Sequence, residues 1–410
     1  MTPAEGLRPR WEVADAIRLH GEAFLRKHGG HLSGAQKKAL RDLARCRTAA
    51  LGGHVSRCLD CNRDRIAYNS CRNRHCPKCG ALARARWLEK EAAHLLPVEY
   101  FHVVFTLPSE VADLAEANPA PLYEALFRAA AAALREVAAN PKRLGAQVGA
   151  LMVLHTWGQN LHHHPHVHAV VTGGGPSCDA RGAVEAEPTW KACRPGFLLP
   201  VRVLSRVFRG LYLASLQQLF EAGRLAFRGR LSALADPKAF AAWLAPLRLR
   251  DWVVYAKPPF GGPERVLKYL ARYTHRVALS NARLANVDGD GVRFHYKDYA
   301  DDGRTKAMTL SGVEFLRRFA VHVLPPGFVK IRHYGLLAHR DRDARLALCR
   351  RLLAAEAERA KGDAAEEPGA AVTTAPACSI APAAEPCCPH CGGRRLIRLN
   401  LPDAPNPDTS

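Results

Sequence analysis

A histidine-rich segment near the middle of the chain places the strongest constraint on its fold. Residues 150–175 read ALMVLHTWGQNLHHHPHVHAVVTGGG. A proline and a triple-glycine run bound a short apolar stretch, which is typical of a buried strand. Because side chains alternate faces along a strand, His166 and His168 point to one face and Val167 to the other. Two imidazoles one pleat apart on rigid backbone can bind one divalent metal ion.

The alternative for this segment is a histidine-rich surface turn, since three further histidines precede the strand at positions 162–164. Residues 151–157 read as a neighbouring strand, and an antiparallel hairpin is the simplest pairing. In one register of that hairpin His155 lies on the same face as His166, and a slip of one residue turns it away. His102, on another predicted strand, is a second histidine that could lie near this pair. An ordinary structural role is the alternative for both.

Two C-x2-C pairs near the N-terminus predict a zinc site. Cys58 and Cys61 are followed, 14 residues on, by Cys76 and Cys79. Each pair can place two thiolates on one tetrahedral ion, and two pairs at this spacing make a zinc ribbon. Four thiolates leave no open position, so the zinc is expected to be structural.

Three other potential zinc ligands lie near these cysteines: His54, Cys71 and His75. They could form a second metal site or replace one of the four cysteines, and their spacing does not decide between these alternatives. A lone C-x2-C pair, Cys388 and Cys391, could be half of a further metal site together with Cys378. With 13 cysteines in a chain expected to be intracellular, metal binding is favoured over disulfides.

The charge balance predicts a polyanionic partner. Lys and Arg number 59 against 38 Asp and Glu, a formal net charge of +21, which favours nucleic acid over a basic protein that merely stays soluble. No apolar stretch approaches the length of a membrane span, and the N-terminus has no signal-like core. We therefore expect a soluble, cytoplasmic protein without a membrane partner.

Strand and helix patterns alternate without one repeated unit, which predicts an α/β sandwich with a largely antiparallel sheet. Strands are expected at 100–107, 151–157, 166–172, 252–255, 292–299, 306–310 and 328–332. Helices are expected at 81–96, 119–140, 204–225, 237–244, 264–276, 313–323 and 340–361, besides two within 1–50. The expected domains are a helical and zinc-binding unit at 1–96, a larger unit at 97–340, a helix and disordered linker at 341–386, and a cysteine knuckle and tail at 387–410.

The predicted helix at residues 264–277, ERVLKYLARYTHRV, combines a basic side with two tyrosines. Tyr269 and Tyr273 are four residues apart and therefore share one stripe. The four cations of this helix lie within about a quarter of its circumference, and they are Arg265, Lys268, Arg272 and Arg276. The alternative is a pair of core aromatics with solvated hydroxyls. Beside a row of cations, however, a phenol can attack a phosphodiester if a metal at His166 and His168 stabilises the transition state.

The chain resembles the insertion-sequence transposases of the rolling-circle, two-tyrosine HUH class, the "IS ninety-one" type. HUH denotes two histidines around a hydrophobic residue. The resemblance covers about residues 10–345, and the segments that carry it, in this order, are 69–79, 155–161, 164–168, 269–276 and 331–335. Each motif alone is moderately specific, and their order is highly so.

This resemblance implies an α+β fold, with a palm-like, largely antiparallel sheet flanked by helices, that acts on single-stranded DNA. It implies His166 and His168 as ligands of a catalytic Mg²⁺ or Mn²⁺, and Tyr269 and Tyr273 as paired nucleophiles. The implied reaction nicks and rejoins DNA at element ends and in target DNA through a phosphotyrosine. The cysteines match a transposase zinc-binding domain. The recognised sequences and the oligomeric state stay open.

Two other functions are compatible with the residues alone. One is a non-catalytic zinc-ribbon protein that binds nucleic acid, and it predicts salt-sensitive binding without cleavage. The other is a metal phosphodiesterase that uses water, in which the tyrosines are structural. It predicts cleavage without a covalent protein–DNA intermediate.

Overall fold

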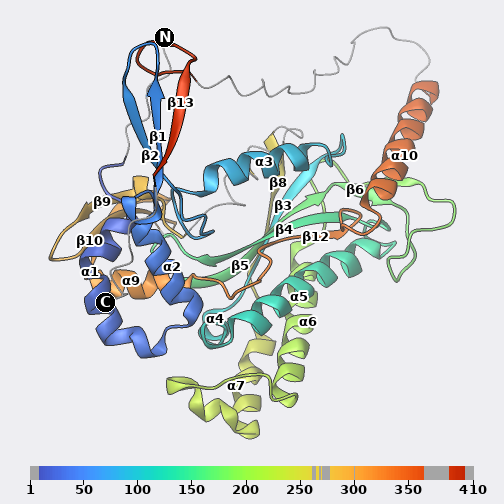
Figure 1. The fold of residues 1–410 in the computed structure, drawn as a ribbon. Coiled ribbons are helices and arrows are strands. Elements are labelled where there is room, and N and C mark those ends of the chain that lie inside the picture. The colour runs from blue at the N-terminus through green and yellow to red at the C-terminus, as the bar shows by residue number, and fades with distance from the viewer. Residues whose placement is uncertain are drawn as a thin grey trace.

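The computed structural model describes residues 9–260, 265–266, 269, 278–299, 301–363 and 387–401 (Figure 1). Its centre is a five-stranded sheet in which every neighbouring pair is antiparallel. In spatial order the strands are β12 (Ile331–Gly335), β4 (Gly149–Trp157), β5 (His163–Thr172), β3 (Tyr100–Thr106) and β8 (Val254–Phe260). The predicted α+β fold with an antiparallel sheet flanked by helices is therefore confirmed.

One face of this sheet carries the main hydrophobic core. Alternate residues of β3, such as Phe101, Val103 and Phe105, are buried there, as period-2 alternation requires. The helices that cover this face are α4 (Ser109–Ala117), α5 (Pro119–Ala139), α6 (Val201–Glu221) and α7 (Pro237–Leu249). The alanines of α5 let it lie close to the strands and to α6 (Figure 1).

The opposite face of the sheet is crossed by α3 (Gly80–Ala92) (Figure 1). Trp87 and Leu88 of this helix, together with Val266 and Tyr269, pack with the buried strand residues Tyr100, Leu151 and Val170. This face carries the predicted histidines, because His168 and Val170 are two residues apart on β5. One face of the sheet thus builds the core, and the other is left for a functional site.

A second core joins segments from distant parts of the chain. It packs α1 (Val13–His28) and α2 (Gly34–Arg45) against α9 (Gly312–Val321) and the meander β9 (Leu284–Val287), β10 (Val292–Asp298) and β11 (Arg304–Leu310). Ser33 caps the beginning of α2, where Gln36 completes a capping box. Residues 284–321 therefore pack with the N-terminal helices, across the boundary expected at residue 96.

A three-stranded ribbon joins the N-terminal region to the last described segment of the chain. Strands β1 (Gly53–Cys58) and β2 (Asp64–Tyr68) form a hairpin, and β13 (Leu396–Leu401) pairs with β1 along its whole length. The predicted boundary at residue 386 consequently does not separate the C-terminal knuckle from the N-terminal domain, because β13 is a strand of the same sheet.

The remaining elements are peripheral. A two-stranded sheet joins β6 (Gly174–Pro176) and β7 (Trp190–Ala192), and α10 (Arg342–Asp363) follows the last strand of the central sheet. Short 3-10 turns are η1 (Gly29–His31), η2 (Ala49–Leu51), η3 (Gly229–Ala235) and η4 (Asn281–Arg283). Within the described ranges, no helix combines the length and the apolar character needed to cross a bilayer.

Candidate active site and metal centres

Three histidines converge on the face of the central sheet that lies opposite the main core. In the β4–β5 hairpin His155 lies directly opposite His166, so both point to the face that His168 also occupies. The Nε2 atoms of His166 and His168 are 3.0 Å apart. One nitrogen from each of His155, His166 and His168 lies within 4.8 Å of the others. The sequence left two registers of the β4–β5 hairpin open, and the observed one places His155 on the same face as His166 and His168.

The donor set fits a divalent metal ion. Ligands about 2.1 Å from an octahedral ion stand about 3 Å apart at right angles, which matches the Nε2 separation. The Nδ1 atom of His166 lies 2.7 Å from the His164 carbonyl oxygen, so it can donate there and leave Nε2 free as a ligand. Burial lowers the pKa of His166 to about 4, which keeps its imidazole neutral near neutral pH.

A tyrosine hydroxyl lies beside these histidines. Tyr269 Oη is 2.5 Å from His102 Nε2 and 3.3 Å from His168 Nδ1. His102 comes from β3, next to β5 in the sheet, and its ring stacks on that of His168 at 5.1 Å between centroids. Burial, with a smaller effect of Lys257, lowers the pKa of His102 to about 3. His102 thus contacts the phenol and lies outside the three-histidine group.

The rest of the predicted tyrosine helix is described only in part. Arg265 is exposed and Val266 is buried, so these two residues take the expected polar and apolar sides. Outside the described residues lie four predicted site residues, Tyr273, Lys268, Arg272 and Arg276.

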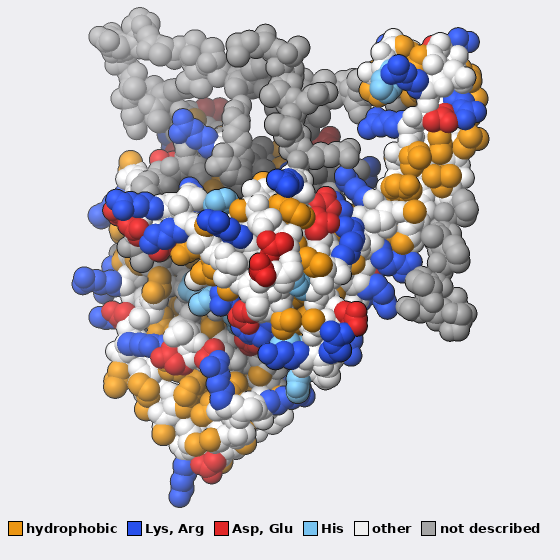
Figure 2. All heavy atoms as spheres, turned by 90° about the vertical axis from the view of Figure 1, so that its left-hand side faces the viewer, with side chains coloured by type: hydrophobic (Ala, Val, Ile, Leu, Met, Phe, Trp, Pro, Cys, Tyr) orange, Lys and Arg blue, Asp and Glu red, His pale blue; other side chains and the backbone are white. Residues whose placement is uncertain are grey.

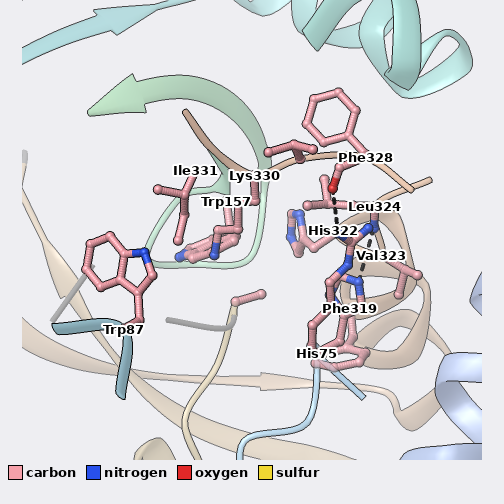
Figure 3. A pocket seen from close by; sticks show the side chains of 13 residues that line it. His75, Trp87, Trp157, Phe319, His322, Val323, Leu324, Phe328, Lys330 and Ile331 are labelled. Atoms are coloured by element: carbon pink, nitrogen blue, oxygen red, sulfur yellow. Dashed lines mark hydrogen bonds between the residues drawn. The ribbon is translucent and has the colours of Figure 1, made fainter. Parts of the chain in front are cut away.

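A pocket lies at the end of β4, close to His155 (Figure 3). It encloses about 390 Å³ between Trp87 of α3, Trp157 at the end of β4, and the segment around Phe319 and Lys330. The Trp157 ring stacks on His155 with 4.6 Å between centroids and 20° between planes. One wall of the pocket, the Trp157 ring, is therefore in contact with a candidate metal ligand.

The first cysteine cluster joins the end of α2 to the loop before α3. Its members are Cys46, Cys71, Cys76 and Cys79. The sulfur separations are 3.3 Å from Cys46 to Cys79, 3.5 Å from Cys46 to Cys76 and 3.7 Å from Cys71 to Cys79. Ligands of a tetrahedral zinc with Zn–S bonds of about 2.3 Å stand about 3.8 Å apart. Hydrogen bonds from the Cys71 and Cys76 thiols lower the pKa of Cys46, as suits a thiolate ligand.

The second cluster unites Cys58 and Cys61 with Cys388 and Cys391. The predicted ribbon of Cys58, Cys61, Cys76 and Cys79 is therefore wrong in its grouping: the two N-terminal pairs belong to different clusters. The reason is that β1 and β2 carry the first pair away from α2 and toward β13, where the C-terminal pair meets it.

Among the other predicted ligands, only Cys71 joins a cluster. His54 Nδ1 lies 3.1 Å from an Arg398 nitrogen. His75 Nε2 accepts a hydrogen bond from the Leu324 backbone, and burial lowers the pKa of His75 to about 3. Cys378 lies outside the described residues. Sequence reasoning missed Cys46, which belongs to no C-x2-C pair and so gave no spacing signal.

Comparison with protein families matches two models. Residues 16–107 match a transposase zinc-binding domain, and residues 149–344 match a model described as a putative transposase. Together these matches include the first cysteine cluster, the Cys58 and Cys61 pair, and the three histidines.

Two curated relatives extend over most of the chain. A putative transposase, y4qJ, from Sinorhizobium fredii is 55% identical over 342 residues, which are 83% of this chain and 84% of that protein. The transposase for insertion sequence element IS801 from Pseudomonas savastanoi pv. phaseolicola is 30% identical over 83% of this chain and 78% of its own. Among solved structures, the conjugative relaxase TrwC in complex with oriT DNA matches 45% of this chain and 68% of its own at 19% identity, with a TM-score of 0.25.

Proposed function

Because this chain belongs to the insertion-sequence transposases of the "IS ninety-one" type, with their N-terminal zinc-binding domain, we propose that it nicks and rejoins single-stranded DNA through a covalent phosphotyrosine. The observation that carries the proposal is the position of the Tyr269 hydroxyl. It lies 2.5 Å from His102 and 3.3 Å from His168, although 101 residues separate Tyr269 from His168 in the chain.

In the proposed reaction Tyr269 is the nucleophile. Its oxygen attacks the phosphorus of a DNA phosphodiester, its proton passes to the neighbouring His102, and the P–O bond to the leaving deoxyribose breaks. The leaving oxygen takes a proton and becomes a free hydroxyl on the other DNA end. The bond energy stays in the phosphotyrosine, so attack by a DNA hydroxyl can rejoin the strand without ATP. Tyr273 would perform a second transfer before the first is resolved.

The histidine group supports metal assistance. A divalent ion held by His155, His166 and His168 would polarise the non-bridging oxygens of the phosphate and stabilise the charge of the transition state. Mg²⁺ or Mn²⁺ is the proposed ion. The cations of the tyrosine helix, of which Arg265 is described and exposed, would contact the flanking phosphates at the element ends and in the target.

The first cysteine cluster is the proposed structural zinc site of the matched zinc-binding domain. Four thiolates leave no position for substrate, so its role would be to fix the loop 71–79. From this loop Arg74 donates hydrogen bonds to the backbone oxygens of Phe328 and Pro325, just before β12. Zinc at this cluster would therefore hold the N-terminal domain against the catalytic sheet.

The test is a denaturing gel of labelled single-stranded DNA carrying element ends, incubated with Mg²⁺ or Mn²⁺. Wild-type protein should give a slowly migrating covalent adduct, and Tyr269→Phe should lose the adduct formed by that residue. Tyr273→Phe, tested separately, shows which tyrosine acts first. Tyr299→Phe is the matched control, because Tyr299 directly follows β10 and is 74% exposed.

Two results would refute the proposal. Adducts that persist in the Tyr269→Phe, Tyr273→Phe double variant would exclude both tyrosines. Cleavage without any adduct would instead identify a phosphodiesterase that uses water.

A further inference from the structure

The second cysteine cluster brings together residues that lie more than 300 positions apart. Cys58 Sγ is 3.6 Å from Cys391 Sγ, and Cys61 Sγ is 3.6 Å from Cys388 Sγ. All four sulfurs lie within 4.8 Å of one another. A disulfide needs about 2.05 Å between sulfurs, whereas tetrahedral zinc needs about 3.8 Å between its thiolates. The separations fit the metal.

The backbone arranges both cysteine pairs as tight knuckles. In the C-terminal pair the Cys388 amide donates to the Gly393 carbonyl at 2.8 Å, and the Gly392 amide donates to the Cys388 carbonyl at 2.8 Å. Gly392 has a φ of +72°, which a glycine adopts without strain. In the N-terminal pair the Cys58 amide donates to the Arg63 carbonyl at 3.0 Å.

The ribbon that carries these knuckles has almost no hydrophobic core. On β2 and β13 no described side chain is buried, and Ile66, Ile397 and Leu399 are 56%, 44% and 49% exposed. The ribbon stands away from the main body, with apolar side chains open to solvent along it (Figure 2). The buried cysteines Cys58 and Cys388 sit at its knuckle end. A sheet of this size without a core requires another source of stability, and a metal cross-link supplies one.

We propose that Cys58, Cys61, Cys388 and Cys391 bind a second structural zinc ion, which ties the C-terminal segment 387–401 to the N-terminal domain. The site goes beyond the proposed DNA chemistry, and half of its ligands lie outside the matched zinc-binding domain at 16–107. An ion pair between Asp60 and Arg395 spans the same junction and supports this pairing.

The test is the zinc content of the purified full-length protein, measured by native mass spectrometry and elemental analysis. Wild type should carry two zinc ions, and the Cys388→Ser, Cys391→Ser double variant should carry one. Cys387→Ser is the matched control, because this exposed neighbour lies outside the cluster, and it should keep both ions. In the double variant, trypsin should also cleave faster after the arginines at 394, 395 and 398.

The proposal is overturned if the double variant holds as many zinc ions as wild type. The ribbon stands apart from the central sheet, so the thermal unfolding of the main body should be unchanged in the double variant, which distinguishes loss of this site from general misfolding.

The pocket beside the histidine group supports a second and independent inference. Two indole rings enter it from different elements, Trp87 from α3 and Trp157 from β4 (Figure 3). Lys330 Nζ lies 5.0 Å from the centroid of the Trp157 ring, and Arg74 also lines the pocket. Burial lowers the pKa of Lys330 to about 7, so Arg74 is the permanent cation here. Aromatic rings beside a cation suit a nucleobase attached to a phosphate backbone.

We infer that this pocket receives a nucleobase next to the phosphate that reacts. The volume of about 390 Å³ lies in the range of small-ligand pockets. Its position follows from Trp157, whose ring stacks on the candidate metal ligand His155. This inference rests on the proposed function, since the ligand is the DNA substrate, and it names a binding site that the reaction chemistry itself does not require.

The test compares the affinity of two 12-nucleotide probes by fluorescence anisotropy without added Mg²⁺ or Mn²⁺. One probe is oligothymidine and the other is an abasic oligomer with the same backbone charge. Wild type should prefer the thymidine probe by about fivefold or more, since base stacking contributes about 1–3 kcal/mol per base. Trp87→Ala should bring this preference toward one, whereas Trp243→Ala, on the remote helix α7, should retain it.

An unchanged preference in Trp87→Ala would overturn the inference. The outcome is separable from the proposed function, because adduct formation at Tyr269 is read on a gel with metal present. A protein that forms no adduct yet shows the Trp87-dependent preference would refute only the tyrosine chemistry.

Discussion

Replacing His155 by alanine should weaken binding of the catalytic ion while leaving the nucleophile in place. His155 supplies one of three imidazoles whose nitrogens lie within 4.8 Å of one another, so its loss leaves two protein ligands. Changes even to the partners of metal ligands cost about 10–100-fold in affinity. A direct ligand should cost at least the upper end of that range, about 100-fold or 2.7 kcal/mol.

The comparison variant is His102→Ala. His102 touches the Tyr269 hydroxyl and lies outside the three-histidine group. Its loss should slow adduct formation at saturating metal by about 10²–10⁴-fold, the usual contribution of a positioned acid or base. His102 also lies 2.8 Å from His168 Nδ1, so a shift of the metal midpoint by up to about tenfold is expected.

The assay measures the initial rate of adduct formation against Mn²⁺ concentration. His155→Ala should move the midpoint to higher Mn²⁺ by about 100-fold and recover most of the rate at saturation, and His295→Ala, exposed on β10, serves as control. If His155→Ala had the same Mn²⁺ midpoint as wild type, the assignment of His155 as a metal ligand would be refuted. If the Mn²⁺ midpoint shifted more in His102→Ala than in His155→Ala, His102 would be the metal ligand and His155 the residue that assists the nucleophile.

Three further predictions concern zinc, stability and the choice of metal. Cys46→Ser should lower the zinc content by one ion and expose the loop 71–79 to proteases, as mass spectrometry and limited proteolysis would show; unchanged zinc would remove Cys46 from the site. Burial alone would raise the pKa of Glu91, but its hydrogen bond with His333 at 3.0 Å lowers it. Glu91→Ala should therefore cost about 3 kcal/mol in chemical denaturation at pH 7, and this difference should shrink as the pH falls below about 4.3, where the unfolded carboxyl takes up its proton. Mn²⁺ should support adduct formation at lower concentration than Mg²⁺, because imidazole nitrogens suit Mn²⁺ better than the oxygen-seeking Mg²⁺; equal midpoints would contradict this ligand set.

Local periodicity predicted β3, β4, β5 and the long helices α5 and α6, whereas the strands expected at 252–255 and 328–332 are observed at Val254–Phe260 and Ile331–Gly335. The alternation around His166 and His168 places both rings on one face, and the hairpin with residues 151–157 is observed as β4 and β5. Helix α4 was missed because it is a nine-residue helix between Pro108 and Asn118. So short a helix depends on burying Val111 and Leu114, which is a tertiary effect that propensity does not report.

Long-range pairing was beyond sequence reasoning. The spacing of Cys58, Cys61, Cys76 and Cys79 is compatible with one zinc ribbon, yet the chain closes two clusters instead. Cys46 has no local partner, and the C-terminal pair meets Cys58 and Cys61 only because β13 aligns with β1. A C-x2-C pair specifies two ligands on one ion, and the topology of the folded chain decides which pair completes it.

The zinc loop and the histidine group are connected through the edge of the central sheet. Arg74 follows Cys71 in the loop and donates to the carbonyls of Phe328 and Pro325. These residues lead into β12, which pairs with β4, the strand that carries His155. Lys330, in the same connection, lies over the ring of Trp157, and that ring stacks on His155. Zinc bound at the first cysteine cluster would therefore help to place the candidate catalytic ligand His155, through this series of contacts. Such a dependence would give a physical reason for the two domains to occur in one chain.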